Sequence, residues 1–417
     1  MDKLVIEGGK PLSGTIKVSG AKNAALPILI ATLLTDEPCV IENVPSTLRD
    51  LRTTFRLLES LGKKVVVEGS TVRVLSTGSL KTQAPYEIVK QMRASVLAAG
   101  PLLARFGLVR VPIPGGCAIG LRPIDIHLKG FEAMGARRIA DQGDIIMSAP
   151  KLNPVTIKLR FPSVGATQNL MMAAAATVGK TTIKNAAREP EMEDLGLFLQ
   201  RLGAKVVGAG TATVTVEGRA KLHGTRHRVI PDRIEAGTFL LACAAARGRV
   251  KLLGAEASHL TAVISALKKA GAKLRAGKGW IEISMDRRPK AVSVVTKPHP
   301  GFPTDLQAPW MSLMTICTGF AKVTETVFEN RFLHAAELGR MGAQIAVSGR
   351  TAVVAGQERL SGAPIMASDI RAGAALLVAG LAAKGRTAIA RVYHVDRGYE
   401  WVERKLSGAG ARIERQK

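Results

Sequence analysis

The chain has 417 residues, too many for one ordinary hydrophobic core, and 47% of them are hydrophobic, so we expect two folded domains rather than disorder. Lysine and arginine number 59 against 33 aspartates and glutamates, which gives a net charge of +26 and favours anionic partners. The basic residues are scattered and aromatic residues make up only 4%, which argues against a nucleic-acid-binding tail or a base-stacking surface.

The cysteines and the apolar segments exclude further classes of protein. Cys39, Cys117, Cys243 and Cys317 are far apart, so neither a zinc site nor a disulfide framework is predicted, and we expect no metal and no cofactor. The N-terminus lacks a signal-peptide pattern, and the longest apolar stretch, 372–383, is too short to span a bilayer. We therefore expect a cytoplasmic protein without a membrane span. The sequence does not define its oligomeric state, and a monomer is slightly favoured.

A short motif repeats six times along the chain. A hydrophobic residue or alanine is followed by glycine, then by alanine or lysine, and usually by a basic residue, with the glycine at positions 62, 135, 203, 271, 342 and 410. The spacing is roughly 70 residues, so the chain consists of six units of one kind. We expect the repeated glycine to end a helix, because glycine tolerates the left-handed conformation needed at a helix C-terminus.

The units share one order of elements. The first unit has a predicted strand at 15–18, an apolar helix at 22–35, an amphipathic helix at 51–60 and a strand at 65–67. Apolar helices follow in the later units at 93–106, 166–178, 236–246, 306–318 and 372–383, with a further strand at 156–159. None of the six apolar helices has a polar face, so each must be surrounded by protein.

This pattern predicts an α/β fold with its helices inside and its sheets outside. Six units of one kind favour two inside-out, barrel-like domains of three repeats each. We expect the first domain to span 21–229, including the segment around Cys117, and the second to combine 1–20 with 230–417.

Polar residues precede the buried helices. The start of a helix offers unpaired N–H groups and a positive dipole, so several such starts directed at one cleft between the domains would bind a polyanion. The alternative is ordinary helix capping by Ser19, Ser163, Thr304 and Ser368. Capping explains less well the cations Lys22, Arg93 and Arg371, which oppose the helix dipole unless an anion is bound.

Cys117 is the sharpest single feature of the sequence. It lies in a segment, 111–123, that carries three glycines and three prolines, with Arg122 five residues further on. Glycine lets the backbone flex or approach a ligand, and a nearby cation lowers the pKa of a thiol. We therefore predict a reactive thiol here, and packed thiols at Cys39, Cys243 and Cys317.

Two further segments combine an arginine with acidic and aromatic residues after a strand. These are 327–332, which contains Arg331, and 393–400, which contains Arg397. Either can be a functional site or a structural ion pair, and composition does not decide between them. The seven histidines show no metal-ligand spacing, so we expect structural roles for His127 and His394.

The whole chain resembles the enolpyruvyl transferases, and within them the branch that acts on a sugar nucleotide. The resemblance runs from Ile6 to Arg415. Its motifs are SGAKNAALP at 19–27, PGGC at 114–117, SVGAT at 163–167, NAAREPE at 185–191, PTD at 303–305, ETVFENR at 325–331 and HVDRGYE at 394–400. The family fold is two inside-out α/β domains, each with three copies of one unit. The chain departs from some relatives at Phe161, where they have lysine.

The resemblance implies two substrates, phosphoenolpyruvate and UDP-N-acetylglucosamine. Lys22 and Asn23 match the motif that meets both of them, and Arg122 and Arg397 match cations on the phosphate and carboxylate of phosphoenolpyruvate. Cys117 matches a cysteine that donates a proton and forms a covalent adduct with phosphoenolpyruvate. Catalytic roles are thus expected for Lys22, Cys117, Asp305 and Arg397.

The resemblance also implies contacts to the sugar nucleotide. Asp305 matches a carboxylate near the attacking 3-hydroxyl, and Val327 matches a backbone contact. Contacts to the UDP portion are implied for Arg93, Arg122, Pro123, Ile124, Asp125, Ile126, Ser163, Val164 and Gly165, and further positions in the cleft for Arg331, Asp369 and Arg371.

The implied reaction is addition followed by elimination, as the first committed step of peptidoglycan synthesis. The 3-hydroxyl attacks C2 of phosphoenolpyruvate while C3 is protonated, and phosphate then leaves. One alternative is the related enolpyruvylshikimate-phosphate synthase, against which the PGGC and SVGAT motifs argue. Another is a catalytically silent, basic polyanion-binding protein with the same fold.

Overall fold

The chain forms two compact units in a computed structural model that describes residues 2–112, 124–141 and 144–417. Unit 1 contains residues 2–19 and 231–417, and unit 2 contains the described residues between 20 and 230. Cys117, Arg122 and Pro123 lie outside the described residues.

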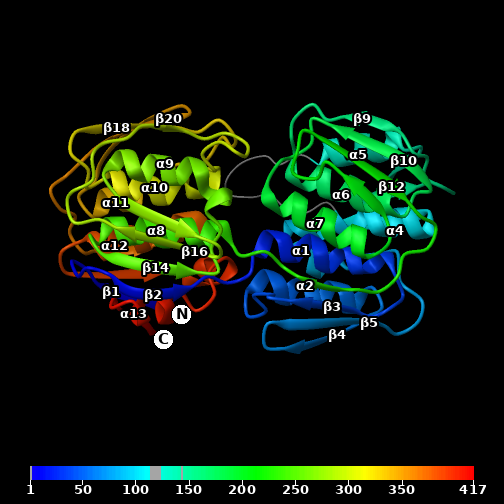
Figure 1. The fold of residues 1–417 in the computed structure, drawn as a ribbon, viewed down its shortest axis with the longest axis horizontal. Helices are drawn as coiled ribbons and strands as arrows, with labels where there is room; N and C mark the ends of the chain where they lie inside the picture. The colour runs from blue at the N-terminus through cyan, green and yellow to red at the C-terminus, as the bar shows by residue number, and fades with distance from the viewer. Residues whose placement is uncertain (1, 113–123, 142–143) are drawn as a thin grey trace. The chain divides into compact units, whose positions relative to one another are not determined.

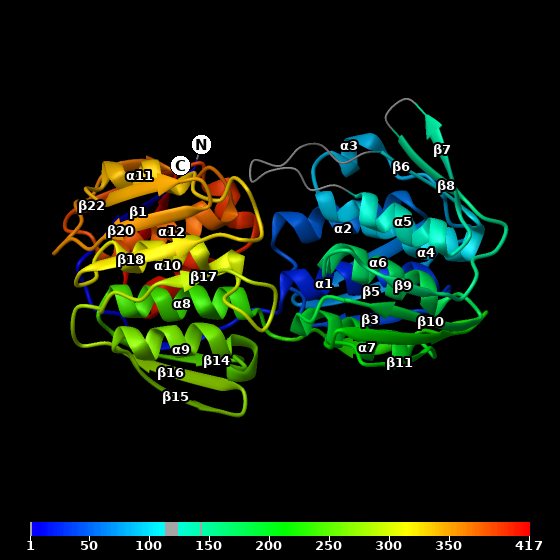
Figure 2. The same ribbon diagram turned by 90° about the horizontal axis from the view of Figure 1, so that it is seen from above.

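Three helices fill the interior of unit 1. They are α8 (Arg233–Ala245), α10 (Gln307–Met314) and α12 (Ile370–Ala382), which pack against one another (Figures 1 and 2). Every residue of α8 and of α10 is buried. Protein therefore surrounds these two helices on every side. This confirms the prediction that helices without a polar face are buried.

Three sheets and three amphipathic helices cover this interior. The sheets have the strand orders β21-β22-β1-β23, β15-β16-β14-β2 and β17-β18-β20-β19. Their strands are β1 (Lys3–Glu7), β2 (Ser13–Lys17), β14 (Arg249–Leu253), β15 (Lys273–Gly277), β16 (Trp280–Ser284), β17 (Val294–Val295), β18 (Phe320–Thr324), β19 (Gln344–Ser348), β20 (Thr351–Ala355), β21 (Pro364–Met366), β22 (Arg386–Ala390) and β23 (Arg412–Gln416). The helices are α9 (Thr261–Ala270), α11 (His334–Arg340) and α13 (Val402–Gly408), with 3-10 turns η3 (Ala257–Leu260), η4 (Thr304–Leu306) and η5 (Val392–Arg397).

Unit 2 repeats the same plan. Its inner helices are α1 (Lys22–Ala31), α4 (Ala99–Phe106) and α6 (Val164–Ala175), with η1 (Thr32–Leu34) after α1 and η2 (Arg93–Ala98) before α4. The outer helices are α2 (Arg49–Ser60), α3 (Tyr86–Val89), α5 (Asp125–Ala133) and α7 (Pro190–Arg201). The strands are β3 (Cys39–Glu42), β4 (Lys63–Glu68), β5 (Thr71–Ser76), β6 (Leu108–Pro112), β7 (Arg137–Asp141), β8 (Asp144–Ser148), β9 (Thr156–Lys158), β10 (Gly179–Lys184), β11 (Lys205–Val207), β12 (Thr213–Gly218) and β13 (Arg226–Arg228).

The sheets of both units share one topology. In β9-β10-β12-β11 the first pair is parallel and the other two pairs are antiparallel, and β13-β3-β5-β4 repeats this order. The sheet β6-β8-β7 has three strands, and an isolated parallel bridge between Gln83 and Arg110 occupies the place of a fourth. Each repeat of the sequence thus corresponds to one sheet with this order of strands.

The glycines of the repeated motif all have the backbone conformation that was predicted. Their φ angles are 101° at Gly62, 95° at Gly135, 111° at Gly203, 106° at Gly271, 91° at Gly342 and 88° at Gly410. An L-residue with a side chain rarely adopts such angles, so glycine stops the amphipathic helix and turns the chain into the next strand.

The ends of the apolar helices differ from the prediction. The helix expected at 166–178 runs from Val164 to Ala175, because the side chain of Ser163 caps it at the start. The helix expected at 306–318 is a 3-10 turn, η4, followed by the shorter α10. Hydrophobic periodicity does not register these local hydrogen bonds, so it places helices better than their ends.

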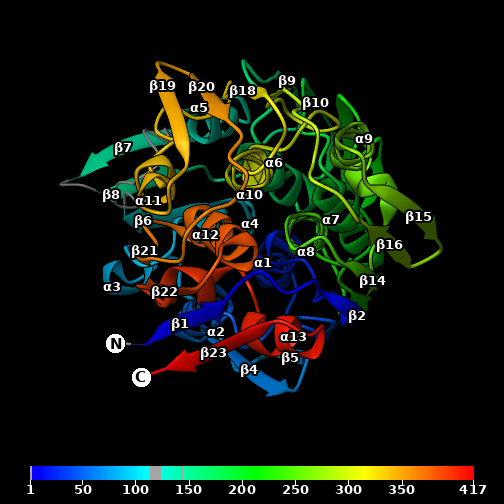
Figure 3. The same cartoon turned by 90° about the vertical axis from the view of Figure 1, so that its left-hand side faces the viewer.

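The two sequence-distant ends of the chain meet in one sheet of unit 1. Strand β1 lies between β22 and β23, and Lys3 is paired with Gln416 (Figure 3). Strand β2 likewise pairs with β14, so the N-terminal strands complete two sheets whose other strands come from the second half of the chain.

Candidate active site

In unit 2, the start of α1 carries a buried ion pair. Lys22 is the first residue of the helix, and its Nζ lies 3.3 Å from Oδ2 of Asp50 in α2. The two side chains are 9% and 7% exposed, so little water solvates either charge. Asn23, the next residue, is half-buried. A carboxylate therefore already holds the lysine at the positive end of this helix.

A second group of predicted residues is joined by Asn169 of α6. Its Nδ2 donates to the carbonyl oxygen of Val96 at 3.0 Å and lies 3.1 Å from Nδ1 of His127, while its Oδ1 accepts from the Gly100 amide at 2.7 Å. One buried amide thus ties η2, α4, α5 and α6 together. The starts of η2, α5 and α6 carry Arg93, the run 124–126 and the run 163–165.

His127 packs at the centre of this group. A Cβ added to Gly165 would lie 3.2 Å from its ring, so the glycine allows close approach. Burial, with a contribution from the charge of Arg93, lowers the pKa of His127 to about 4. The neutral, hydrogen-bonded ring agrees with the structural role that was predicted. Outside it, Arg160 donates from one nitrogen to both oxygens of Asp125, at 2.8 and 3.0 Å.

In unit 1, a carboxylate meets two arginines. Oδ1 of Asp305 accepts from Nη2 of Arg331 at 2.9 Å and from Nε of Arg371 at 2.8 Å. Burial raises the pKa of Asp305, but the charges of Arg371 and Arg331 outweigh burial, so its pKa lies well below the usual range. Both arginine side chains are less than a tenth exposed. Arg331 is therefore part of an ion pair, which was one of the two alternatives for its segment.

The surrounding side chains hold this cluster in place. Nη1 of Arg371 is 3.4 Å from the hydroxyl of Tyr399, which is 2.9 Å from the hydroxyl of Thr238. Asp369 caps α12 by accepting from the amides of Arg371 and Ala372 at 2.8 and 3.1 Å. The side chain of Arg371 is thus held by Asp305 and Tyr399, and its backbone amide by Asp369.

Val327 is positioned by a buried acid that sequence reasoning missed. One oxygen of Glu325 accepts from the amide of Val327 at 2.7 Å, and the other accepts from the hydroxyl of Thr304 at 2.8 Å. The carboxylate therefore connects the segment of Val327 to the residue next to Asp305. Arg397 ends η5, two residues before Tyr399, and is half-buried.

Helix capping, the alternative reading of the polar helix starts, applies to one of the four proposed residues. Ser163 caps α6 by accepting from the Ala166 amide at 3.3 Å. Thr304 instead binds Glu325, Ser368 donates to Asp369 at 3.2 Å, and Ser19 binds Glu400 and Lys405. The caps of α8 and α12 are Asp232 and Asp369.

The other cysteines are packed as predicted. Cys39, Cys243 and Cys317 are buried and free, and burial raises the pKa of each thiol, that of Cys243 to about 12. Such thiols are poor nucleophiles at neutral pH. In the described part of the chain, no group of three or more His, Cys, Asp or Glu side chains is arranged to hold a metal ion.

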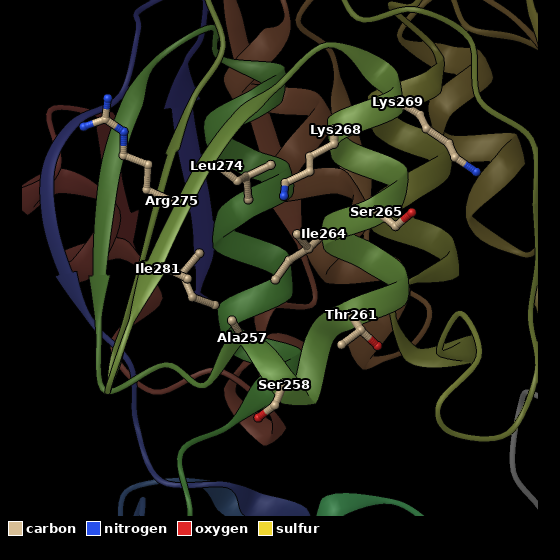
Figure 4. A pocket seen from close by; sticks show the side chains of 11 residues that line it. Ala257, Ser258, Thr261, Ile264, Ser265, Lys268, Lys269, Leu274, Arg275 and Ile281 are labelled. Atoms are coloured by element: carbon tan, nitrogen blue, oxygen red, sulfur yellow. The ribbon is translucent and has the colours of Figure 1, made fainter.

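A groove of about 580 Å³ runs between α9 and the β15–β16 hairpin of unit 1 (Figure 4). Its floor includes Ile264, Leu274 and Ile281, and Lys268 and Arg275 lie along it. None of the predicted site residues lines this groove. Among the described residues, no helix is long and apolar enough to cross a membrane.

Comparison with known proteins defines the class first. The chain matches the EPSP synthase (3-phosphoshikimate 1-carboxyvinyltransferase) family over residues 6–406, so the class is that of the carboxyvinyl, or enolpyruvyl, transferases. Two solved structures have this fold: the enolpyruvyl transferase NikO from Streptomyces tendae (TM-score 0.89, 24% identity, 100% of this chain and 99% of that one) and the EPSP synthase from Acinetobacter baumannii (TM-score 0.76, 18% identity, 100% of both). The predicted inside-out α/β fold is confirmed.

More similar sequences narrow the class. A UDP-N-acetylglucosamine 1-carboxyvinyltransferase from Endomicrobium trichonymphae is 52% identical over 415 residues, 99% of each chain. One from Nitratidesulfovibrio vulgaris (strain Hildenborough) is 53% identical over 417 residues, 100% of each chain. The chain belongs to the UDP-N-acetylglucosamine 1-carboxyvinyltransferase family.

Proposed function

We propose that this protein transfers the enolpyruvyl group of phosphoenolpyruvate to the 3-hydroxyl of UDP-N-acetylglucosamine and releases phosphate. The observation that carries the proposal is identity above 50%, over the full length, with relatives that bear this activity in their name. We place the reaction in the cytoplasm, as the first committed step of peptidoglycan synthesis.

Unit 2 supplies the cations and helix starts that suit the sugar nucleotide. In the proposal, Arg93, the run 122–126 and the run 163–165 contact the UDP portion, and Lys22 with Asn23 meets both substrates. The Asn169 and His127 network supports this part, because it holds three of these segments together without adding a charge. Pre-organised N–H groups and cations bind phosphate without a reorganisation cost.

Unit 1 supplies the carboxylate for proton transfer. In the addition step, the 3-hydroxyl oxygen bonds to C2 of phosphoenolpyruvate, its proton passes to Asp305, and C3 receives a proton from Cys117. In the elimination step, C3 gives a proton back to the Cys117 thiolate and the bond from C2 to the phosphate oxygen breaks. The leaving phosphate keeps the electrons of that bond and takes the proton that Asp305 had accepted. Val327 and Asp369 complete the substrate contacts in this unit.

The arginine pair makes Asp305 a weak base while both arginines bind it. A general base works best when its pKa is near the working pH, and Arg331 and Arg371 hold the pKa of Asp305 far below that. We propose that the anionic substrate groups draw these two arginines, with Arg397, towards themselves. Each hydrogen bond that Asp305 loses raises its pKa, so substrate binding prepares the base.

The decisive experiment measures phosphate release from phosphoenolpyruvate with two acceptors. We expect release with UDP-N-acetylglucosamine and none with shikimate 3-phosphate. Release with shikimate 3-phosphate alone would assign the chain to the related synthase. No turnover with either acceptor, together with tight and salt-sensitive binding to RNA, would instead identify a silent polyanion-binding protein.

The role of Cys117 has its own test. Cys117→Ser should lose most of the activity and all labelling by the epoxide fosfomycin, because a serine hydroxyl is a far weaker acid and nucleophile. Cys117→Asp should keep activity, since a carboxylic acid can also protonate C3. Mass spectrometry that finds undiminished label on Cys39, Cys243 or Cys317 would refute the assignment.

A further inference from the structure

Ser19, the last residue of the first segment of unit 1, has hydrogen bonds on every polar group. Its amide donates to Oε2 of Glu235 at 2.6 Å, and its carbonyl oxygen accepts from the Asp232 amide at 2.9 Å. Its hydroxyl donates to Oε2 of Glu400 at 3.0 Å and accepts from Nζ of Lys405 at 2.7 Å. Ser19 lies two residues after β2, outside any strand, and the backbone and side chain are both held there by hydrogen bonds.

The partners of Ser19 are themselves paired. Nζ of Lys405 donates to Oε1 of Glu235 at 2.6 Å, and the side chains of these two residues are 16% and 1% exposed. Burial raises the pKa of Glu235 to about 7, while the charge of Lys405 acts in the opposite direction. Burying the two charges therefore costs free energy of folding. Removing one of them also lowers stability, because the other charge would stay buried without its partner. We call Ser19, Glu235, Glu400 and Lys405 the Ser19 cluster.

The cluster modifies an ordinary helix cap. Asp232 is the N-cap of α8 and Glu235 is its third residue, the positions of a capping box. In a capping box the third residue accepts from the N-cap amide. Here the Asp232 amide bonds to Ser19 instead, and the Glu235 carboxylate bonds to the Ser19 amide. The start of α8 thus binds a second segment of the chain, the one that contains Ser19, in place of the hydrogen bond between Glu235 and the Asp232 amide.

The segments that meet here lead directly to residues with proposed catalytic roles. Lys22 and Asn23 follow Ser19 by three and four residues, and Arg397 precedes Glu400 by three. Strand β2, which leads to Ser19, packs along α13, the helix that carries Lys405 (Figure 3). The hydrogen bonds of the Ser19 cluster join these two stretches of backbone within unit 1, so the cluster acts on the position of the backbone.

We infer that Glu235 and Lys405 are positioning residues for the transfer reaction: through Ser19 and Glu400 they fix the backbone segment of unit 1 that carries Arg397. This inference rests on the proposed function. A misplacement of about 1 Å in a reacting group can lower a rate by a hundredfold, so a rigid anchor three residues away is consequential.

The first test compares Lys405→Met with Lys63→Met. Lys63 is also buried but belongs to unit 2, where its Nζ donates to the carbonyl oxygen of Thr35 at the end of η1. Lys405→Met should lower kcat/KM for phosphoenolpyruvate at least tenfold, and Lys405→Arg should restore part of it. Lys63→Met should stay within twofold of the unmodified chain at a temperature where all variants are folded. An equal loss in both methionine variants would reduce the effect to general destabilisation and overturn the inference.

The second test does not depend on activity. Hydrogen–deuterium exchange of the peptide that covers 18–24 should accelerate at least tenfold in Lys405→Met and Glu235→Gln, and remain unchanged in Lys63→Met. Unchanged exchange in the cluster variants would overturn the anchor even if their kinetics changed. If the unmodified chain shows no transfer at all, the proposed function fails, and the exchange data still decide whether the cluster fixes this segment.

Discussion

The two units use the starts of their buried helices differently. In unit 2, Lys22 is paired with the carboxylate of Asp50, and Arg93 lies near a neutral histidine. In unit 1, Arg331 and Arg371 share the single carboxylate of Asp305. The same repeat therefore yields a lysine paired with one carboxylate in one unit and a carboxylate paired with two arginines in the other. The comparison shows that charged side chains gather at the starts of the buried helices in both units. The residues packed against each start then decide which charges are paired and how far their pKa values shift.

The largest effect is expected from removing the carboxylate of unit 1. Asp305→Asn leaves two buried arginines without their common partner and removes the proposed base. Turnover should fall at least a hundredfold, and the free energy of unfolding should fall by about 1 to 3 kcal/mol. Phosphate release and urea unfolding measure the two quantities. A variant with turnover within twofold of the original would contradict the role of Asp305.

A smaller effect is expected from the matching change in unit 2. Asp50→Asn removes one partner of Lys22, which then loses the carboxylate that fixes its ammonium group. The KM for phosphoenolpyruvate should rise by roughly threefold to tenfold, with a smaller change in kcat. Steady-state kinetics at saturating UDP-N-acetylglucosamine check this. If Asp50→Asn proves as damaging as Asp305→Asn, the contrast between the units is wrong.

A third prediction, which leaves turnover aside, separates the units by pH. Folding raises the pKa of Glu235 in unit 1 from 4.5 to about 7. Between these pH values the folded state holds a proton on Glu235 that the unfolded state has released, so the stability gained from this proton is lost as pH rises through that window. The folded state lowers the pKa of His127 in unit 2 from 6.5 to about 4, so its contribution is lost as pH falls through that window.

The measurement is the urea midpoint between pH 4 and 8. Glu235→Gln should remove a decline towards high pH, and His127→Asn should remove a decline towards low pH, each on the order of 1 to 3 kcal/mol across its window. Slopes that keep their sign and size in both variants would show that other groups control the pH dependence.

Much of the fold was readable from the sequence. The six glycines and the six apolar helices predicted repeated units with buried helices, because glycine φ angles and the absence of a polar face are local properties. The ends of the helices were less accurate, since they depend on side-chain hydrogen bonds such as that of Ser163.

The site was only partly readable. Motifs pointed to Lys22 and Asp305, but not to Asp50, which pairs with Lys22, or to Asn169, which holds the segment of Arg93. These partners lie 28 and 73 residues from the groups they bind and are ordinary polar residues in composition. Only the folded chain brings them within hydrogen-bonding distance, so no spacing rule could identify them.

The placement of β1 and β2 sets an order for folding during synthesis. Unit 2 has all of its strands once residue 228 has been made, whereas β1 must wait for β22 and β23, the last of which ends at residue 416. The ribosome thus delivers unit 2 complete while two short strands of unit 1 remain unpaired. Strand β2 finds its partner β14 (Arg249–Leu253) soon afterwards, so β22 and β23 decide when the sheet that contains β1 closes.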